Sequence, residues 1–528
     1  MFSVARSLND GLKQGRTKIL VGSLKPPSDL LEDIPLIEGV RTVSSYNWLS
    51  EDEVDSDVPT IQVPGAPPLV SFPQDTPSMK LQPDTGSHFI DQNAARMSGA
   101  SGMIPGLAAC HAYKKDFKII DYDIVTDRNN LIKLFELMEI VETKAGMAPA
   151  ISTPWRAPSI EAAASRRGRG NHKPVHPFFQ RVPGMGRGGG IRSMDQRREI
   201  VRIDADLVSG YDNNTGKYVY DEASGPKTLV LTRWEPQNQE TVMSSVDFRG
   251  FGGTFLTKTR RFLSLEDGII QERGPRDVTS FHCLVEYKLL GMKFLVRYHA
   301  DACDMTRAEF IKWISQDGLR DLSEADGDSE SASEDAYGSE VGSEDTTLSG
   351  PPDTDTFDLL DAFKTLNLKT DDTNPMSKKP VPSLKKTAPE VNTHKFCTLA
   401  QIPMSIIHTP NTLFPSNKIL QVKTRGQHTG LNREALYRQL FFSQTQRVFV
   451  AYHTKGVFSE ASVLKEDIST GLVNWGNSNK EILRKLVTIL REVQEKVDEA
   501  GGKAALMFGS KKKNNEDSVI LEVHTRDD

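Results

Sequence analysis

The sequence predicts a mixed α/β (α+β) protein whose central mixed sheet is interrupted by long polar inserts. Three observations lead to this prediction. Residues 280–288 and 293–301 both alternate apolar and polar side chains, as half-buried strands do. Residues 418–425 form a further apolar strand, which runs into a helical segment at 431–444. We expect this strand to lie in the same central sheet as the two strands at 280–301. A longer stretch, 479–500, places its apolar residues at helical spacing.

Length and composition limit how much of the chain can form a core. The 528 residues carry a formal charge of -6 and are 37% hydrophobic. Stretches rich in Pro, Ser and Asp bury too little apolar area to offset chain entropy, so we expect one structured body of roughly 300 residues. Four cysteines at irregular spacing form neither a disulfide framework nor a zinc motif, which favours a reducing compartment: Cys110, Cys283, Cys303 and Cys397.

Shifts in composition divide the chain into six segments. In order, they are a mostly disordered N-terminal region (1–80), the N-terminal part of the core (81–160), a basic Arg/Gly-rich insert (161–198), the first half of the core (199–316), an acidic and then Pro/Lys-rich disordered linker (317–395), and the second half of the core (396–528). The linker separates the two halves of the core in sequence, but a fold can carry such an insertion on its surface.

The first half of the core begins with two strand-like runs and a helix. Residues 119–125 predict a strand, and Asp127 is a plausible N-cap for a helix over 130–141. Alternation predicts further strands at 201–207 and 228–234.

The next element is a hairpin that turns at Leu290-Gly291. This pairing sorts the side chains onto two faces. One face is apolar (Phe281, Cys283, Val285, Tyr287, Phe294, Val296, Tyr298, Ala300), and the other bears the polar and charged residues (His282, Glu286, Arg297, His299, Asp301) with Leu284 and Leu295 between them. A sheet of this kind suits an active cleft or a nucleic-acid surface.

The second half of the core continues from the 418–425 strand and its helix. A third strand is predicted over 447–453, and a final strand pair over 504–508 and 518–523 follows the long helix.

Two of these strands, far apart in sequence, carry polar residues that could take part in catalysis. Asp301 ends the hairpin, while Gln421 and Lys423 alternate on the 418–425 strand. The order of an Asp, an x-Lys strand, a helix and a strand resembles the PD-(D/E)XK nuclease superfamily. The resemblance implies a nuclease-like core in which Asp301 and residue 421 hold Mg²⁺ or Mn²⁺ and Lys423 helps to activate water. Taken singly, Asp301 could instead cap a strand or pair with Arg297, and Lys423 could lie on a solvated face.

Several motifs narrow this resemblance to a poorly characterised family of fungal proteins with the same fold, distantly similar to decapping exoribonucleases. The motifs are residues 91–96, 123–130, 423–425, 437–445 and 450–456. This chain departs from the family pattern at Gln421, where an acid is usual. Residues 248–253 predict a Gly-rich bend that leads to a short basic segment at 258–261. Acids are usual in the family after this bend, where this chain has Thr254 and Leu256. Because Mg²⁺ requires carboxylates, we expect a weakened or lost metal site, with an active nuclease as the alternative. Glu286 and Asp304 are the local acids that could compensate.

The cationic residues favour RNA or DNA as a partner. Arg297 and Arg425, with Gln439 on the following helix, are candidates for the cleft, and Arg187 and Arg192 represent the basic insert. Phosphate contacts require little more than positive charge. The insert could equally be a solubilising linker.

A third reading is a non-catalytic scaffold. Leu360–Leu368 has the spacing of an amphipathic recognition helix for a protein partner, and it also resembles a nuclear export signal. No apolar run approaches the ~20 residues of a membrane helix. We expect an intracellular protein of the cytoplasm, the nucleus or both. The basic first 20 residues are also compatible with a mitochondrial presequence.

Overall fold

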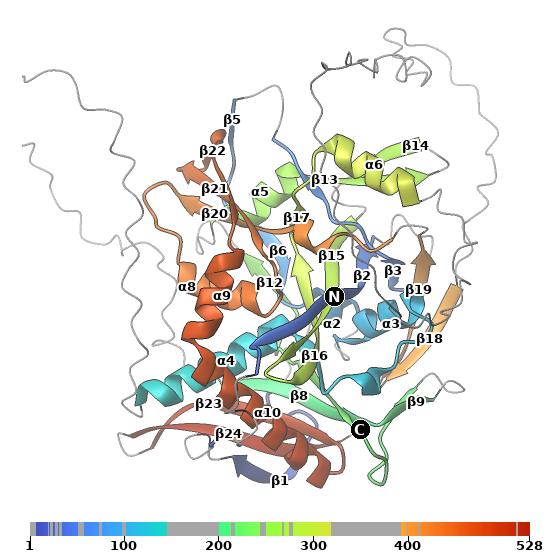
Figure 1. Cartoon of the computed structure of the whole chain (residues 1–528), viewed down its shortest axis with the longest axis vertical. Coiled ribbons are helices and arrows are strands. Elements are labelled where there is room, and N and C mark those ends of the chain that lie inside the picture. The colour runs from blue at the N-terminus through green and yellow to red at the C-terminus, as the bar shows by residue number, and fades with distance from the viewer. Residues whose placement is uncertain are drawn as a thin grey trace, which may run out of the picture. The chain divides into compact units, whose positions relative to one another are not determined.

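The computed structural model (Figure 1) describes most of the predicted core. It describes residues 7–19, 34–50, 58–72, 77–97, 102–144, 200–212, 217–242, 250–266, 269–273, 278–317, 392–398, 400–409, 412–513 and 516–527, with residues 21, 25, 26 and 30. These residues belong to one compact unit. The basic insert with Arg187 and Arg192, and the 360–368 segment, lie outside the described residues.

The largest element is a 14-stranded mixed sheet. Its order is β1 (Leu12–Ile19), β24 (Glu516–Arg526), β23 (Lys503–Lys513), β8 (Val201–Val208), β11 (Thr228–Arg233), β7 (Ile124–Asp127), β16 (Met292–Ala300), β15 (Val278–Leu289), β2 (Ile37–Leu49), β3 (Thr60–Val63), β19 (Ala400–His408), β18 (Asn392–Thr398), β10 (Lys217–Val219) and β9 (Gly210–Asp212). Strand β7 runs parallel to both of its neighbours, whereas β15 and β16 are antiparallel. The predicted α+β fold with a mixed sheet is therefore confirmed.

A second sheet has eight strands. Its order is β14 (Ile269–Arg273), β13 (Arg260–Glu266), β4 (Leu69–Val70), β17 (Ala302–Cys303), β20 (Ile419–Gly426), β21 (Arg447–Thr454), β22 (Val457–Asp467) and β5 (Ser78–Lys80), and β6 (Gly86–Phe89) pairs separately with β12 (Gln239–Val242). The expectation that the hairpin and the 418–425 strand share one sheet is wrong. The chain crosses between the sheets at Asp301, because β16 ends just before it and β17, which pairs with β20, begins just after it.

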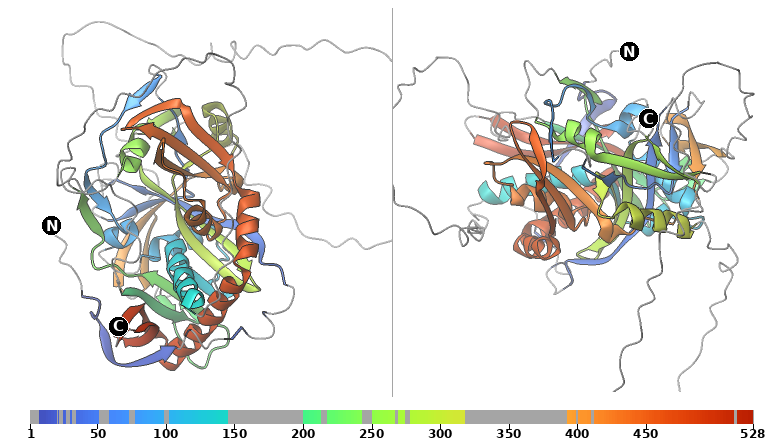
Figure 2. Two further views of the ribbon diagram at one scale, coloured as in Figure 1. Left: turned by 90° about the vertical axis from the view of Figure 1, so that its left-hand side faces the viewer. Right: turned by 90° about the horizontal axis from the view of Figure 1, so that it is seen from above.

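Helices cover both sheets. They are α2 (Gln92–Arg96), α3 (Ile104–Tyr113), α4 (Arg128–Lys144), α5 (Gly252–Thr259), α6 (Arg307–Asp317), α8 (Arg433–Phe441), α9 (Ser469–Ser478) and α10 (Lys480–Glu499), with 3-10 turns η2 (Ile119–Asp121) and η5 (Ser416–Lys418). The predicted 119–125 strand is thus a turn followed by β7. Helices α4 and α10 pack together (Figure 2). Lys485 of α10 also donates a hydrogen bond to Glu142 of α4. No helix in the described part of the chain has both the length and the apolarity needed to cross a membrane.

The predicted hairpin has the expected register. Phe281 pairs with Ala300 and Leu289 with Met292, and the turn residues Leu290 and Gly291 have φ values of 49° and 82°. Its apolar face lies in the main core. The opposite face is less open than predicted, because α3 covers Leu284 and neighbouring residues to form a second core. The end of this face that leads to Asp301 borders a cavity, which His282, Arg297 and His299 line.

The N-terminal region contains more structure than its composition suggests. The prediction that residues 1–80 are mostly disordered is wrong for β2, a 13-residue strand between β15 and β3. Tyr46 and Trp48 of β2 are fully buried, and both donate a hydrogen bond to Asn93 Oδ1, at 2.7 and 2.9 Å. The Pro- and Asp-rich average over 80 residues concealed this apolar run.

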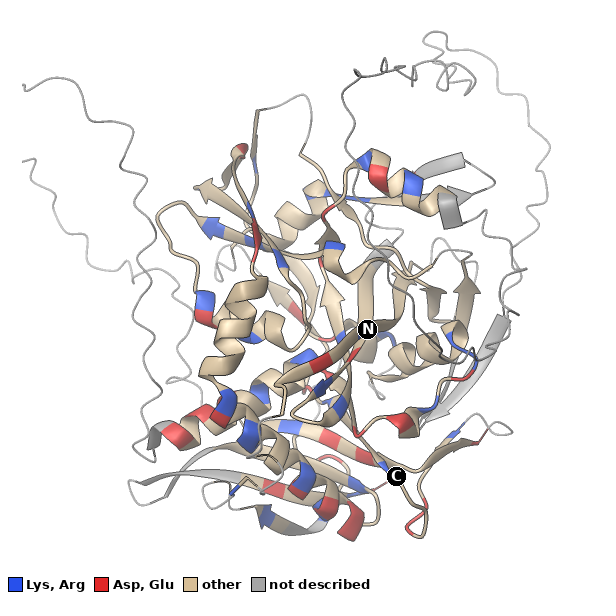
Figure 3. Cartoon of the chain, viewed as in Figure 1, with Lys and Arg blue, Asp and Glu red and all other residues tan. Residues whose placement is uncertain are grey.

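Most charged residues on the regular elements have partners of opposite sign. Along β8 and α10, acidic and basic residues are interspersed (Figure 3). On β8, Arg202 pairs with Asp204 at 2.7 Å, and Arg526 of β24 pairs with Asp204 at 2.7 Å. These elements therefore present no surface of a single charge.

Candidate nucleic-acid interface

Asp301 lies where the two sheets meet, and it is buried. Its Oδ2 accepts hydrogen bonds from the side-chain amide of Gln421 and from the backbone N–H of Val422, the latter at 3.0 Å. Lys423 is close enough to act on the Asp301 charge. The predicted convergence of Asp301, Gln421 and Lys423 is therefore confirmed, across 120 residues of sequence between Asp301 and Gln421.

Gln421 joins a carboxylate to a guanidinium group. Its Nε2 donates to Asp301, and its Oε1 accepts from Arg128 Nη1 at 3.3 Å. This orientation follows from chemistry, because a carboxylate only accepts and a guanidinium only donates. The amide oxygen, the one atom of Gln421 that could bind a metal, thus faces a cation.

The charge on Asp301 is held by its neighbours. Burial would raise the pKa of Asp301, but His299, Lys423 and Arg260 together hold it below its usual value. His299 Nδ1 lies 3.4 Å from Asp301 Oδ1. Asp301 is therefore an anion at neutral pH, and both of its oxygens already face donors.

Lys423 is largely buried beside this anion. Its Nζ donates to Gln439 Oε1 at 2.8 Å, so the helix residue predicted to face the cleft does contact the site. Burial, together with the charges of Arg128 and Arg425, lowers the pKa of Lys423 to about 8, although Asp301 acts in the opposite direction. Cations thus outnumber anions around Asp301.

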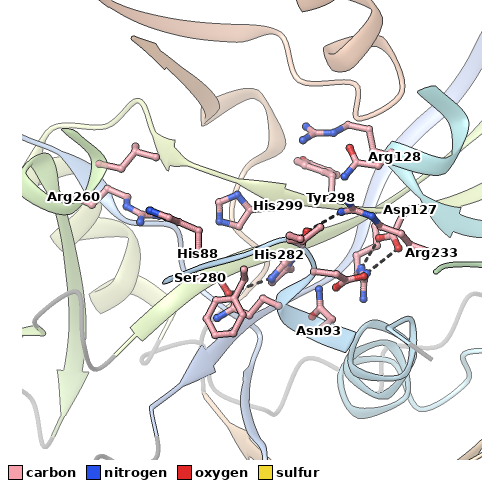
Figure 4. A pocket seen from close by; sticks show the side chains of 17 residues that line it. His88, Asn93, Asp127, Arg128, Arg233, Arg260, Ser280, His282, Tyr298 and His299 are labelled. Atoms are coloured by element: carbon pink, nitrogen blue, oxygen red, sulfur yellow. Dashed lines mark hydrogen bonds and ion pairs between the residues drawn. The ribbon is translucent and has the colours of Figure 1, made fainter. Parts of the chain in front are cut away.

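A cavity of about 470 Å³ opens next to this group (Figure 4). Segments far apart in sequence supply its walls: His88 to Asn93, Asp127 to Asn129, Arg233, Leu256, Arg260, Ser280, His282, and Arg297 to His299. Four arginines against two aspartates give this lining a positive balance. His282 is fully buried against Tyr46, and burial holds its pKa well below the usual value, so it is neutral at pH 7.

Two of the four arginines are neutralised. Arg297 makes two hydrogen bonds to the Asp127 carboxylate, at 2.7 and 2.9 Å, and also donates to the Gly102 carbonyl. Arg233 donates to Glu235 at 2.7 Å. Arg297 was predicted to contact nucleic acid, but it is buried against Gly102 and against Gly106 of α3, and its guanidinium group is held by Asp127.

The other two arginines have no such partner. Neither Arg128 nor Arg260 forms an ion pair with a carboxylate of the described residues, and the buried Nε of each lacks a hydrogen-bond partner. Burial lowers the pKa of both, with Asp301 acting in the opposite direction on each. A cation removed from water without an opposite charge is costly. Arg128 is buried and Arg260 is half-buried, so this arrangement favours an anionic ligand.

The described side chains do not fit the metal that the sequence resemblance implies. They contain no group of three or more His, Cys, Asp or Glu residues placed to hold an ion. Leu256 lines the cavity where an acid was expected, and the N-terminus of α5 is instead capped by Asp84, which accepts from Gly253 and Thr254.

The two acids that could have compensated are engaged elsewhere. Glu286 accepts from Arg41 and Tyr122, and Asp304 accepts from Arg447 at 2.6 Å. A divalent ion would therefore meet a single carboxylate among several cations, which does not suit metal-dependent hydrolysis.

The sequence did not single out Arg128 and Arg260 themselves. Both nevertheless lie in segments that it did single out: Arg128 in the 123–130 motif and Arg260 in the basic run after the Gly-rich bend. Arg128 begins α4 and Arg260 begins β13, and only the folded chain brings them to one cavity.

Comparisons with known proteins gave one family model and a set of solved structures. The model, a domain of unknown function (DUF8563), matches residues 389–526, well under half of the chain. No curated protein matches. The similar structures include S. pombe Rai1 in complex with 3'-FADP (TM-score 0.38, 11% identity, 97% of this chain and 99% of that chain), K. lactis Dxo1 in complex with manganese (0.36, 7%, 97% and 96%) and Candida albicans Rai1 in complex with pU5-Mn2+ (0.41, 8%, 97% and 94%). At these scores the likeness carries no argument about activity.

Proposed function

We propose that this protein binds single-stranded nucleic acid through its phosphate backbone at the Arg128–Arg260 cavity and does not hydrolyse it. One observation carries the proposal: Arg128 and Arg260 line a cavity with no carboxylate partner, beside an Asp301 whose oxygens already face hydrogen-bond donors. Guanidinium groups suit phosphate because they are planar, always charged and rich in donors.

The dimensions of the site favour a single strand. A volume of about 470 Å³ is typical of pockets that enclose one small-molecule-sized group. A base pair in a duplex has its base faces stacked and its phosphates on the outside of a much wider helix, whereas a single strand can insert one nucleotide. Lys423 and Arg425 alternate along β20 next to the cavity, where they can contact neighbouring phosphates.

The described side chains around Asp301 lack the carboxylates that metal-dependent hydrolysis requires. A metal-dependent phosphodiesterase uses carboxylates to hold an ion that activates water and stabilises the developing charge. Here Asp301 stands alone, and Gln421 directs its oxygen to Arg128. Arginines in these positions neutralise a phosphate without supplying a nucleophile.

Titration of labelled single-stranded RNA and DNA at two salt concentrations tests the binding. We expect Arg260→Gln to weaken binding and to reduce its dependence on salt, because each neutralised phosphate releases a counterion. Lys115→Gln, at an exposed position outside the cavity lining, is the matched control and should change neither. Equal behaviour of the two variants would contradict the proposal.

Incubation of the protein with the same strands and Mg²⁺ or Mn²⁺ tests whether it leaves them intact. We expect intact strands with the wild-type protein and with Asp301→Ala. Robust cleavage that Asp301→Ala abolishes would establish the active nuclease instead. Absence of binding to either strand at low salt would favour the scaffold function.

A further inference from the structure

An exposed aromatic side chain stands at the edge of the same cavity. Phe89 lines it and is 48% exposed, the largest value for an aromatic side chain among the described residues. A single exposed apolar residue is ordinary on a protein surface. Phe89 differs because it lines the same cavity as two guanidinium groups without a carboxylate partner among the described residues, that of the buried Arg128 and that of the half-buried Arg260.

The backbone that carries Phe89 is fixed on both sides. Phe89 is the last residue of β6 and pairs with Gln239 of β12. The next residue, Ile90, donates to Asn238 O at 2.8 Å and accepts from Arg233 Nη1 at 2.9 Å. Asp91 then caps α2 by accepting from Ala94 N at 3.1 Å. A ring on such a rigid support loses little conformational freedom when a ligand covers it.

Cations and an exposed ring together match the two chemical parts of a nucleotide. Proteins that bind single strands combine a positively charged groove for phosphates with aromatic side chains on which bases stack. We propose that Phe89 is the stacking platform for one base of the strand, whose adjoining phosphate lies on Arg128 and Arg260. The inference rests on the proposed nucleic-acid binding and assigns the residue that contacts the base.

The carboxylates that line the cavity are consistent with a phosphate on the arginines and a base on Phe89. Asp127 is neutralised by Arg297, and Asp91 is held as the cap of α2. The capping carboxylate of Asp91 would repel a phosphate, so the phosphate is directed toward Arg128 and Arg260. A neutral base tolerates the remaining polar wall, which includes His282 and Ser280.

Two probes separate stacking from charge: a single-stranded RNA of about 12 nucleotides, and inorganic polyphosphate of similar length, which has the negative charge but no base. We expect Phe89→Ala to weaken RNA binding between about fivefold and one hundredfold, the range for loss of one base–aromatic stack. Polyphosphate binding should not change. Phe89→Trp should restore RNA affinity, because it offers a larger ring, and Phe89→Leu should not, because it is apolar without one.

The controls keep the two proposals distinguishable. Tyr113→Ala removes another exposed aromatic side chain, on α3 and outside the cavity lining, and should leave RNA binding unchanged. Unchanged RNA binding in Phe89→Ala, alongside weakened binding in Arg260→Gln, would overturn the stacking and leave the phosphate site intact. An equal loss for RNA and polyphosphate would also overturn it, because Phe89 would then act through the shape of the cavity. Failure of the wild-type protein to bind either probe would remove both proposals.

Discussion

Replacing Gln421 by glutamate should replace its neutral hydrogen bond to Asp301 by repulsion between two carboxylates. In the wild-type protein the Gln421 amide donates to the Asp301 carboxylate, which also accepts from Val422 N. A glutamate would place two carboxylates in contact. At a separation of ~4 Å and an effective dielectric constant of ~20, their repulsion is about 4 kcal/mol.

Arg128 offsets part of this repulsion. It already donates to Gln421 Oε1 at 3.3 Å, and a charge-assisted bond to Glu is stronger than one to a neutral amide by roughly 1 kcal/mol. The loss of the amide donor to Asp301 costs about the same. These two smaller effects cancel, so we expect Gln421→Glu to lower the unfolding free energy by about 4 kcal/mol at neutral pH with EDTA present.

Denaturant titration with and without Mn²⁺ measures both parts of this expectation. The variant gains a second carboxylate, so Mn²⁺ at ~100 times its dissociation constant should restore about 2.7 kcal/mol, while the wild-type protein should not respond. Adding Asp301→Asn to Gln421→Glu exchanges the donor and the acceptor of this hydrogen bond, because the amide then lies at position 301 and the carboxylate at position 421. The double variant should recover stability without metal and lose the Mn²⁺ response. If Gln421→Glu unfolds at the wild-type midpoint in EDTA, the described bridge is wrong.

Three further predictions concern neighbouring groups. Because the pKa of Lys423 is about 8 in the folded protein and 10.5 for a free lysine side chain, the unfolded chain binds more protons between these two pH values. Raising the pH from about 7.5 to 9.5 should therefore increase the stability of the wild type relative to Lys423→Met by about 2 kcal/mol, and parallel pH profiles would contradict this. Asp127→Asn leaves the Arg297 charge buried and should cost about 3–5 kcal/mol in chemical denaturation; a loss below ~1 kcal/mol would mean that the pair is solvated. Deleting residues 165–198, which lie outside the described part, should weaken RNA binding and flatten its salt dependence; unchanged binding would make that insert a linker.

The sequence predicted the elements whose signals are local. Strict alternation around Leu290-Gly291 gave the hairpin register, because the side-chain period of a strand leaves one pairing that buries the apolar face. The order of Asp301, the Lys423 strand and the following helix placed these residues together, despite the long linker between them. Both predictions depended on strands that are each shorter than ten residues, at 280–288, 293–301 and 418–425.

Features that depend on contacts between distant segments could not be predicted in this way. Arg297 alternates onto the polar face as expected, but α3 and Asp127 cover that face and bury it. The N-terminal strand β2 is stabilised by neighbours, β15 and β3, that its own composition does not indicate. Local patterns show which face a side chain occupies, whereas what covers that face is decided by the rest of the chain.

The residues at this site form a consistent set. A metal site would surround Asp301 with further carboxylates, because a divalent ion is held by anionic oxygens. Instead, the Gln421 amide joins Asp301 to Arg128, and a second unpaired guanidinium, that of Arg260, borders the same cavity. The guanidinium groups supply the positive charge that a metal ion would have brought. They are held by the fold itself, so the site can bind an anion without first binding a metal, and arginine offers phosphate fixed hydrogen-bond donors instead of an activated water. Chemistry of this kind is suited to retaining a strand rather than cutting it.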